Sequence, residues 1–517
     1  MSRVADSFVI SAPALNWDWL LPVIITLTAA IIAILVEAFV PRGSRRPIQL
    51  VLFFATLIGA GVALIVDWSQ RGYTATGSVA HDGPTVLLQA TILIVSLVVG
   101  FVVSERRVDG SGDAFASAAS TIPGSDDERE AARFGWTQTE IWPLLLFSIG
   151  GALLFVSASD FLTLFVALEV MSLPLYLMAG LARRRRLLSQ EAALKYFLLG
   201  AFASAVLLFG IALAYAYSGT LYYNQFAVAV TGTTTGQAIL LASVGLIAVG
   251  MLFKIGAVPF HQWVPDVYTG SPTPVTSFMA SVVKIAAFGA LLRLFYVAFA
   301  GLQWEWRPVI WAVAILTMLV GVIVAITQTD VKRMLAYSSI ANTGYILVGF
   351  VGMSAKSVSF VVFYLFVYGV ATVGSFAIVM LVRDPGGEAT HLSRWTGLGK
   401  TNPLIAGIFS LFLLSFAGIP LTAGFIAKFG VFAAAIDGGA TPLVIVGVIA
   451  SVIAGFFYVR VIVLMYFSEP VVDGPRVAYP SVLTSLAIGL TALATVLLGI
   501  LPQVVLNLIN NAGVFLR

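Results

Sequence analysis

The sequence contains no cysteine, and this absence removes several classes of function. Without a thiolate, the chain can form no disulfide and can hold no cysteine-ligated iron–sulfur cluster. Three histidines, His81, His261 and His391, are too few for a multi-haem or copper site. No glycine-rich dinucleotide motif and no phosphate-binding loop is present. We therefore expect no cofactor, metal or nucleotide on this chain.

Charged residues are also scarce. Only 10% of the 517 residues are charged and 60% are hydrophobic, with a mean hydropathy of +1.01. A soluble protein of this size would need far more polar surface. Apolar runs of about 20 residues recur, and each is long enough to cross ~30 Å of hydrocarbon. The sequence predicts an all-α polytopic membrane protein, with no cleaved signal peptide.

The hydropathy pattern predicts fourteen transmembrane helices. We divide the chain into residues 1–139 (three spans and a charged cytoplasmic loop at 104–139), 140–300 (spans 4–8), 301–470 (spans 9–13) and 471–517 (span 14). We expect the loop to be solvated. The spans lie near 18–40, 48–66, 84–104, 140–158, 160–182, 189–217, 238–258, 274–300, 308–327, 333–352, 357–383, 401–436, 442–467 and 480–510.

The distribution of lysine and arginine predicts the orientation. Of 28 such residues, seventeen fall in the loops after spans 1, 3, 5, 9, 11 and 13, and five fall on the opposite side. The side with the excess is cytoplasmic by the positive-inside rule. Both termini are then extracytoplasmic. The run from Arg183 to Arg186 is interpreted as a topological anchor in the plasma (inner) membrane, and no nucleic-acid partner is expected.

Six positive residues remain inside predicted spans. A charged residue at a helix centre costs roughly 2.5–3.5 kcal/mol on the insertion scale. Arg293 and Arg460 are close enough to a span end to reach the interface as snorkelling anchors. At a rise of about 1.5 Å per residue of helix, Lys284 and Lys428 lie near the middle of the membrane. Their side chains are too far from either interface to reach it.

Lys195, Lys254 and Glu169 are the other ionisable candidates. Lys195 follows Glu191 by four residues, so an ordinary helical ion pair is an alternative to a functional role. Lys254 precedes a helix breaker, which frees backbone groups that need polar surroundings. Glu169 is flanked by apolar residues, and a carboxyl group at that depth should be protonated or paired with a cation.

Two spans carry a helix break in corresponding contexts. Pro259 interrupts the seventh span, and Gly418 and Pro420 interrupt the twelfth. Interrupted spans at matching places indicate inverted repeats with a polar pathway between them. Spans 4–8 and 9–13 form two five-helix units, and an odd number of crossings inverts the second. Simple kinks are the alternative interpretation.

Five long motifs carry a resemblance. FKIGAVPFHQWVPDVYTGSPTPVTSFMASVVKIAAF, DFLTLFVALEVMSLPLY, EAALKYFLLGAFASA, TDVKRMLAYSSIANTGYILVG and SFAGIPLTAGFIAKFGVF follow one another in a shared order between about residues 150 and 470. They resemble the antiporter-like membrane subunits of NADH-quinone oxidoreductase, respiratory complex I. Lysine at 428 and the end of the chain after span 14 favour the subunit N family, whose mitochondrial counterpart is NADH dehydrogenase subunit 2.

The resemblance implies a non-redox, proton-translocating subunit of an NADH:quinone oxidoreductase. Its partners would be other membrane and peripheral subunits, including neighbouring antiporter-like ones, with FMN, iron–sulfur clusters and quinone on those partners. The implied proton-pathway residues are Glu169, Lys195, Lys254, Lys284 and Lys428.

Our mechanistic hypothesis passes a proton from the Glu169–Lys254 pair to Lys284 and then outward through Lys428. Tyr337, Ser338 and Ser339, together with water, could bridge wide gaps. His261 is a candidate for the cytoplasmic entry, with loop capping as its alternative.

Three rival functions remain. A subunit of a multi-subunit Na+/H+ antiporter shares the expected fold. A purely structural scaffold would carry five intramembrane ionisable groups, at an insertion cost of roughly 12–17 kcal/mol, without a functional reason for them. A quinone-binding enzyme acting alone would need an electron donor that the sequence does not offer.

Overall fold

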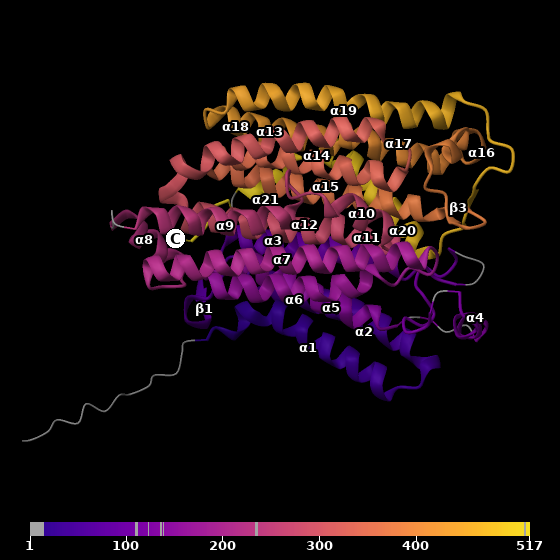
Figure 1. The fold of residues 1–517 in the computed structure, drawn as a ribbon, viewed down its shortest axis with the longest axis horizontal. Coiled ribbons are helices and arrows are strands. Elements are labelled where there is room, and N and C mark those ends of the chain that lie inside the picture. Colours follow the sequence, from indigo (N-terminus) through magenta and orange to yellow (C-terminus); the bar gives the residue numbers. More distant parts are fainter. Residues whose placement is uncertain are drawn as a thin grey trace, which may run out of the picture.

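The computed structural model describes residues 15–108, 112–122, 124–134, 137, 139–232, 236–510 and 513–516. Most helices run nearly parallel to the long axis, stacked from α1 and α2 at one side to α19 at the other (Figure 1). Within the described ranges, eleven helices are long and apolar enough to cross a membrane. The prediction of a helical, multi-pass membrane protein is confirmed.

The amino-terminal half consists of helices and one small antiparallel hairpin, β1–β2. A π-helical turn, Met279–Val283, joins α11 to α12, and another, Leu294–Ala298, extends α12. The elements are α1 (Trp17–Phe39), α2 (Arg42–Val66), β1 (Gly72–Thr74), β2 (Val79–His81), α3 (Gly83–Val103), α4 (Asp126–Arg133), α5 (Ile141–Ser157), α6 (Phe161–Ala179), α7 (Arg186–Ser218), α8 (Tyr223–Gly232), α9 (Gln237–Ile255), α10 (Trp263–Gly270), α11 (Thr273–Phe278) and α12 (Lys284–Arg293).

The carboxy-terminal half is also mostly helical and contains a three-stranded sheet in the order β4-β3-β5. Short 3-10 turns lie at Ala75–Gly77, Ala300–Leu302 and Leu392–Trp395. The elements are α13 (Gln303–Thr327), α14 (Val331–Phe350), α15 (Ala355–Leu381), β3 (Val382–Asp384), β4 (Gly387–Glu388), α16 (Leu398–Thr401), α17 (Pro403–Ala417), α18 (Ala423–Asp437), α19 (Thr441–Phe467), β5 (Arg476–Val477), α20 (Val482–Ile500) and α21 (Gln503–Asn510).

Aspartate caps start three of these helices. The side chains of Asp82, Asp160 and Asp330 accept hydrogen bonds from the backbone N–H three residues later, at 3.1, 2.8 and 2.9 Å. Each cap satisfies one of the four amides that a helix start leaves without an intrahelical partner.

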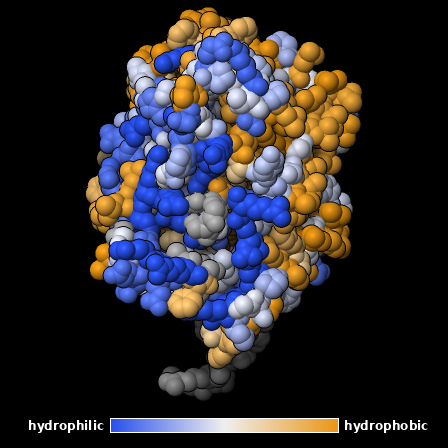
Figure 2. Space-filling view, turned by 90° about the vertical axis from the view of Figure 1, so that its right-hand side faces the viewer, coloured by the Kyte–Doolittle hydropathy of each residue, from blue (hydrophilic) through white to orange (hydrophobic). Residues whose placement is uncertain are grey.

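The core of the bundle consists of the continuous helix 273–298 and of α15, which other helices cover almost completely. The flanking helices have the opposite character and expose large apolar side chains such as Val51, Phe202 and Val452. Figure 2 shows such hydrophobic flanks beside a hydrophilic end surface. Exposed apolar flanks of this kind face hydrocarbon in a membrane protein.

Both ends of the described chain meet the β1–β2 hairpin region. The Asn16 amide donates to Thr74 Oγ1 at 2.9 Å, and the Leu516 amide donates to Asp82 Oδ2 at 2.9 Å. The start of α1 and residues 513–516 therefore share one end of the bundle, opposite α4 and β3 (Figure 1).

The prediction of a solvated loop at 104–139 is wrong for residues 113 and 115–117, which are buried, whereas most side chains of α4 are exposed as expected. Phe115 is buried and forms an isolated antiparallel β-bridge with Ala182. Asp113 pairs with Arg183, and Glu128 pairs with Arg186, both at 2.9 Å. These arginines therefore hold the segment against the bundle, a long-range role that the sequence did not reveal. Residues 109–111, 123, 135–136 and 138, like residues 1–14, lie outside the described ranges.

Arg293 is not a snorkelling anchor. Its side chain is 1% exposed and pairs with Asp82 at 2.6 Å, with the Phe515 ring 4.9 Å away. The partner lies 211 residues earlier in the chain, so depth within the span could not reveal the pair. Arg460 does lie at the exposed surface, where it donates to the Ile326 carbonyl at 3.0 Å.

Candidate functional site

The first helix break lies directly after Lys254. Helix α9 ends at Ile255 and is capped by Gly256, whose φ of 73° is left-handed and suits glycine. Residues 256–262 are not helical, and the chain resumes as α10 at Trp263. Pro259 lies in this interruption, at the position that the sequence predicted.

Lys254 occupies the last turn of α9, where a cation interacts favourably with the helix dipole. Its side chain is buried. Its Nζ donates to Ser172 Oγ at 2.6 Å and to the Tyr196 hydroxyl at 3.5 Å. Tyr196 itself is stacked on Trp263, with ring centroids 4.8 Å apart. The second half of the broken helix thus orients the lysine's tyrosine partner.

Glu169 lies on α6, one turn before Ser172, and is half-buried. It is close enough to Lys254 to interact electrostatically. No ion pair within 4 Å joins the two in the described ranges, and Glu169 Oε1 is buried there without a hydrogen-bond partner. The two groups are therefore near neighbours whose direct contact requires a side-chain movement.

Lys284 lies in the middle of the fully covered helix 273–298 and is 4% exposed. Its Nζ donates to the Ser339 carbonyl at 2.8 Å, to Ser339 Oγ at 2.5 Å and to Thr343 Oγ1 at 2.8 Å. Thr343 Oγ1 in turn donates to the Ile255 carbonyl at 3.1 Å. Lys284 is thus connected through one threonine to the broken end of α9.

Lys428 lies beside the second helix break. Helix α17 ends at Ala417 and α18 starts at Ala423, so Gly418, whose φ is 81°, and Pro420 lie in the interruption. Lys428 Nζ donates to the carbonyls of Phe416 and Ala417, both at 3.1 Å, and to Ser451 Oγ at 3.0 Å. The lysine therefore satisfies carbonyl groups that the break leaves without intrahelical partners.

Helix α14 connects the environments of Lys284 and Lys428. Ser339 and Thr343 contact Lys284, whereas the Tyr345 ring lies 4.4 Å from Lys428 Nζ. On the same helix, Ser338 Oγ bonds the Tyr458 hydroxyl at 2.5 Å, and Asn342 Oδ1 accepts from Tyr364 at 2.7 Å. The predicted residues Ser338 and Ser339 therefore belong to one buried polar strip.

The other candidates lie nearer the surface. The rings of His261 and Tyr337 are 6.5 Å apart and both residues are half-buried. The Lys195 side chain is 43% exposed and pairs with Glu191 at 2.7 Å and Asp266 at 2.8 Å. The local helical pair exists, and Asp266 extends it to Arg333 at 2.7 Å.

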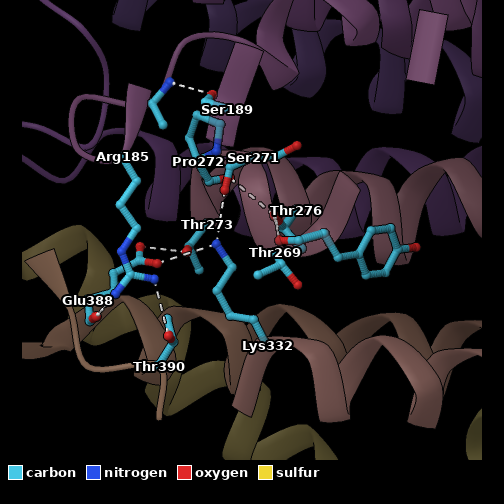
Figure 3. Close-up of polar contacts among 12 residues, drawn as sticks. Arg185, Ser189, Thr269, Ser271, Pro272, Thr273, Thr276, Lys332, Glu388 and Thr390 are labelled. Carbon is cyan, nitrogen blue, oxygen red and sulfur yellow. Dashed lines mark hydrogen bonds and ion pairs between the residues drawn. The ribbon is translucent and has the colours of Figure 1, made fainter. Parts of the chain in front are cut away.

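A second polar cluster was not found by sequence reasoning. Lys332, in the first turn of α14, is 2% exposed; it donates to the Ser271 carbonyl at 2.9 Å and pairs with Glu388 at 3.3 Å. Glu388 also accepts from Thr273 at 2.5 Å, and Arg185 donates to Thr390 at 3.2 Å (Figure 3). The cluster joins the 269–273 connection to the β3–β4 hairpin, a contact over more than 100 residues that no local pattern predicts.

No group of three or more histidine, aspartate or glutamate side chains that could hold a metal occurs among the described residues. This observation concerns their arrangement only. The ionisable groups of the candidate site instead form hydrogen bonds to hydroxyl and carbonyl oxygens.

Comparisons with known proteins give the class first. Residues 158–454, more than half of the chain, match the family described as NADH:quinone oxidoreductase/Mrp antiporter, TM. The fold is similar to a chain of the Mrp complex from Dietzia sp. DQ12-45-1b, with a TM-score of 0.79 and 22% identity over 95% of this chain and 97% of that one. The fold and the two broken helices thus define an antiporter-like membrane subunit.

Closer relatives specify the family. The chain is 55% identical to NADH-quinone oxidoreductase subunit N 3 of Streptomyces griseus, over 98% of this chain and 96% of the relative. It is 53% identical to the subunit N of Rhodococcus opacus, over 99% of both. A chain of respiratory complex I from Thermus thermophilus with bound aureothin has a TM-score of 0.75 and 29% identity, over 94% of this chain and 98% of that one. The chain belongs to the NADH-quinone oxidoreductase subunit N family.

Proposed function

We propose that this chain moves protons across the membrane as the subunit N of an NADH-quinone oxidoreductase. The observation that carries the proposal is the burial of Lys254, Lys284 and Lys428, each of which donates to hydroxyl or carbonyl oxygens without an ion-pair partner within 4 Å in the described ranges. Retaining three such amines inside a bundle is expensive unless their ionisation is used.

In this proposal, ten of the fourteen spans form two inverted five-helix units, 140–300 and 301–470. Residues 1–139 add three spans and 471–517 add the last. Supporting this division, the fourth span of each unit is interrupted, as α9–α10 and as α17–α18. Gly256 and Gly418 end the first halves with similar left-handed φ values, 73° and 81°.

The route begins with Glu169 and Lys254. Movement of the Glu169 carboxylate relative to Lys254 changes how strongly the ammonium is stabilised, and the lysine then releases or takes up a proton. Lys284 receives the proton near the end of α9, supported by the bond from Thr343 to Ile255. The polar strip of α14, with water in its gaps, carries it to Lys428 for discharge.

Lys195 and His261 have entry roles in this scheme. The exposed network of Lys195, Asp266 and Arg333 is suited to contact with a neighbouring antiporter-like subunit. His261 and Tyr337 lie beside the first helix break, where freed backbone groups favour water.

The end of the bundle with α4 and β3 is cytoplasmic in this proposal, and both termini lie outside the cell. The arginines at 42, 45, 46 and 183–186 support this orientation. The redox groups, FMN, iron–sulfur clusters and quinone, belong to partner subunits. The subunit N relatives carry the name NADH-quinone oxidoreductase, which supports that assignment.

A sodium/proton antiporter subunit remains the second candidate because the Mrp chain shares the fold. The higher identity to subunit N chains favours the first function.

Reconstituted complex carrying Glu169→Gln tests the proposal. NADH-driven acidification of proteoliposomes should fall while NADH oxidation in detergent persists, and Glu305→Gln, an exposed glutamate in the first turn of α13, should leave both unchanged. A protonophore should collapse the wild-type signal. Sodium transport driven by an imposed pH gradient, in the absence of NADH, would favour the antiporter alternative.

A further inference from the structure

A cavity of about 810 Å³ lies at the α4 end of the molecule, outside the candidate proton route. It is bounded by the first turns of α2, the end of α1, residues 117–120, and Phe134, Thr137, Thr139 and Glu140. Its volume is within the range typical of ligand sites. Its lining contains four arginines, Arg42, Arg45, Arg46 and Arg106.

The charge of this lining is only partly compensated. Glu37 and Glu140 are the two acidic residues of the lining, against four arginines. Arg45 pairs with Glu37 at 3.5 Å, and Arg46 donates to the Ser104 carbonyl at 2.7 Å. The exposed guanidinium of Arg106 has no hydrogen bond or ion pair to any described residue. A net charge of +2 therefore surrounds the cavity.

The position of three of these arginines is unfavourable for the helix itself. Arg42, Arg45 and Arg46 lie at the start of α2, which has no acidic residue in its first turn and no side-chain cap. A helix amino terminus carries partial positive charge and disfavours cations. An anion in the cavity would relieve both the repulsion among the arginines and their conflict with the helix dipole.

The surroundings of the cavity indicate which anion fits. Leu50 and Phe134 are in its lining. The adjoining flank of α1 and α2 exposes Leu35, Phe39 and Val51. The end surface that Figure 2 views is hydrophilic, with hydrophobic side chains along its edge. A free anion needs no such apolar flank, whereas a phospholipid places its headgroup in the basic cavity and its acyl chains along the exposed helices.

We propose that this cavity binds the headgroup of an anionic phospholipid of the cytoplasmic leaflet. The net charge of +2 matches a headgroup with two phosphates, as in cardiolipin. The arginines would donate to the phosphate oxygens, and the hydroxyls of Ser120 and Thr137 lie in the same lining.

Photo-crosslinking on the assembled complex tests this site at residue level. Membranes containing a cardiolipin with photoreactive acyl chains are irradiated, and crosslinked peptides of this chain are identified by mass spectrometry. We expect crosslinks in α1 and α2, displaced by unlabelled cardiolipin. Arg46→Gln combined with Arg106→Gln should raise the competing lipid concentration needed by about thirtyfold, since each arginine near the surface contributes roughly a fivefold gain.

Two further variants keep the result interpretable. Because Arg46 also bonds Ser104, its loss could loosen packing, so Arg106→Glu alone, an exposed charge reversal, should weaken labelling at least as much as one lost arginine. Arg107→Gln removes the exposed charge that follows Arg106 in the chain. Arg107 does not line the cavity, so labelling should be unchanged.

Three outcomes would overturn the proposal. Equal labelling of the wild type and the Arg46/Arg106 variant would remove the arginines from the site. Equal displacement by phosphatidylcholine would indicate non-specific lipid contact. Displacement by inorganic phosphate at the same phosphate concentration would indicate a small-anion site.

Discussion

Lys428 Nζ and the Ala417 carbonyl oxygen are joined by a hydrogen bond of 3.1 Å across the break between α17 and α18. The backbone group that the interruption frees is thus satisfied by the ionisable side chain that the proposed route requires. The break is not only a kink, because it supplies the acceptors that hold this amine inside the bundle.

Gly418→Ala should therefore affect both stability and pumping. A left-handed φ of 81° costs an alanine about 1–2 kcal/mol. The new Cβ would also lie 3.3 Å from Lys428 Nζ. Gly439→Ala is the matched control, because its φ is 77° and no atom lies within 4 Å of the added Cβ. Both variants should lower the thermal unfolding temperature of the complex, but only Gly418→Ala should lower the number of protons pumped per NADH. An equal number of protons pumped per NADH in the two variants would show that the geometry of the break does not affect the function of Lys428.

Docking of the 112–134 segment should depend on pH through Glu128. Burial alone would raise the pKa of this carboxyl, but the Gly124 amide and the Arg186 guanidinium outweigh it and hold the pKa below its usual range. A depressed folded-state pKa means that the stabilisation is present above the unfolded value of about 4.3 and is lost as pH falls through the folded value.

Limited proteolysis of inside-out vesicles measures this docking. Cleavage between residues 112 and 134 should be slow at pH 7 and faster below about pH 4. Glu128→Gln should cleave faster at pH 7, whereas Glu130→Gln, an exposed residue of the same helix, should resemble the wild type. The pairing has no role in docking if Glu128→Gln is as resistant as the control.

Arg293→Ala should destabilise the chain strongly. It would leave the carboxylate of Asp82 buried without its ion-pair partner, and breaking a buried pair from one side costs about 3–5 kcal/mol. Arg460→Ala removes an exposed arginine and should cost less than about 1 kcal/mol. Thermal unfolding of the purified complex compares the two. Similar unfolding temperatures for both variants would show that the Asp82 pair is not the anchor described.

The sequence predicted those features that depend on position along a single helix. The depth of Lys284 and Lys428 predicted their burial, and Pro259, Gly418 and Pro420 predicted the two interruptions. Both lysines are buried in the structure, and the three residues lie between α9 and α10 and between α17 and α18. These signals are local because the thickness of the hydrocarbon layer sets the scale.

The sequence did not predict the contacts between segments that are distant in the chain. The Arg293–Asp82 pair and the Lys332–Glu388 pair each join residues that are far apart in the chain. The same is true of Arg183 and Arg186, which bind carboxylates in a segment expected to be solvated. A charged residue in a sequence indicates a polar partner but not its location, which depends on how the helices pack.

Lys284→Ala in the reconstituted complex is the most direct test of the central claim, that buried amines carry the proton. The measurement is the ratio of protons pumped to NADH oxidised, with Lys356→Ala, an exposed lysine paired with Asp437, as the control. We expect complexes carrying Lys284→Ala or Lys284→Arg to assemble and oxidise NADH but to lose most proton pumping. The alanine side chain has no titratable proton, and arginine does not release its proton. The control should keep the wild-type ratio. A wild-type ratio in an assembled Lys284→Ala complex would contradict the account.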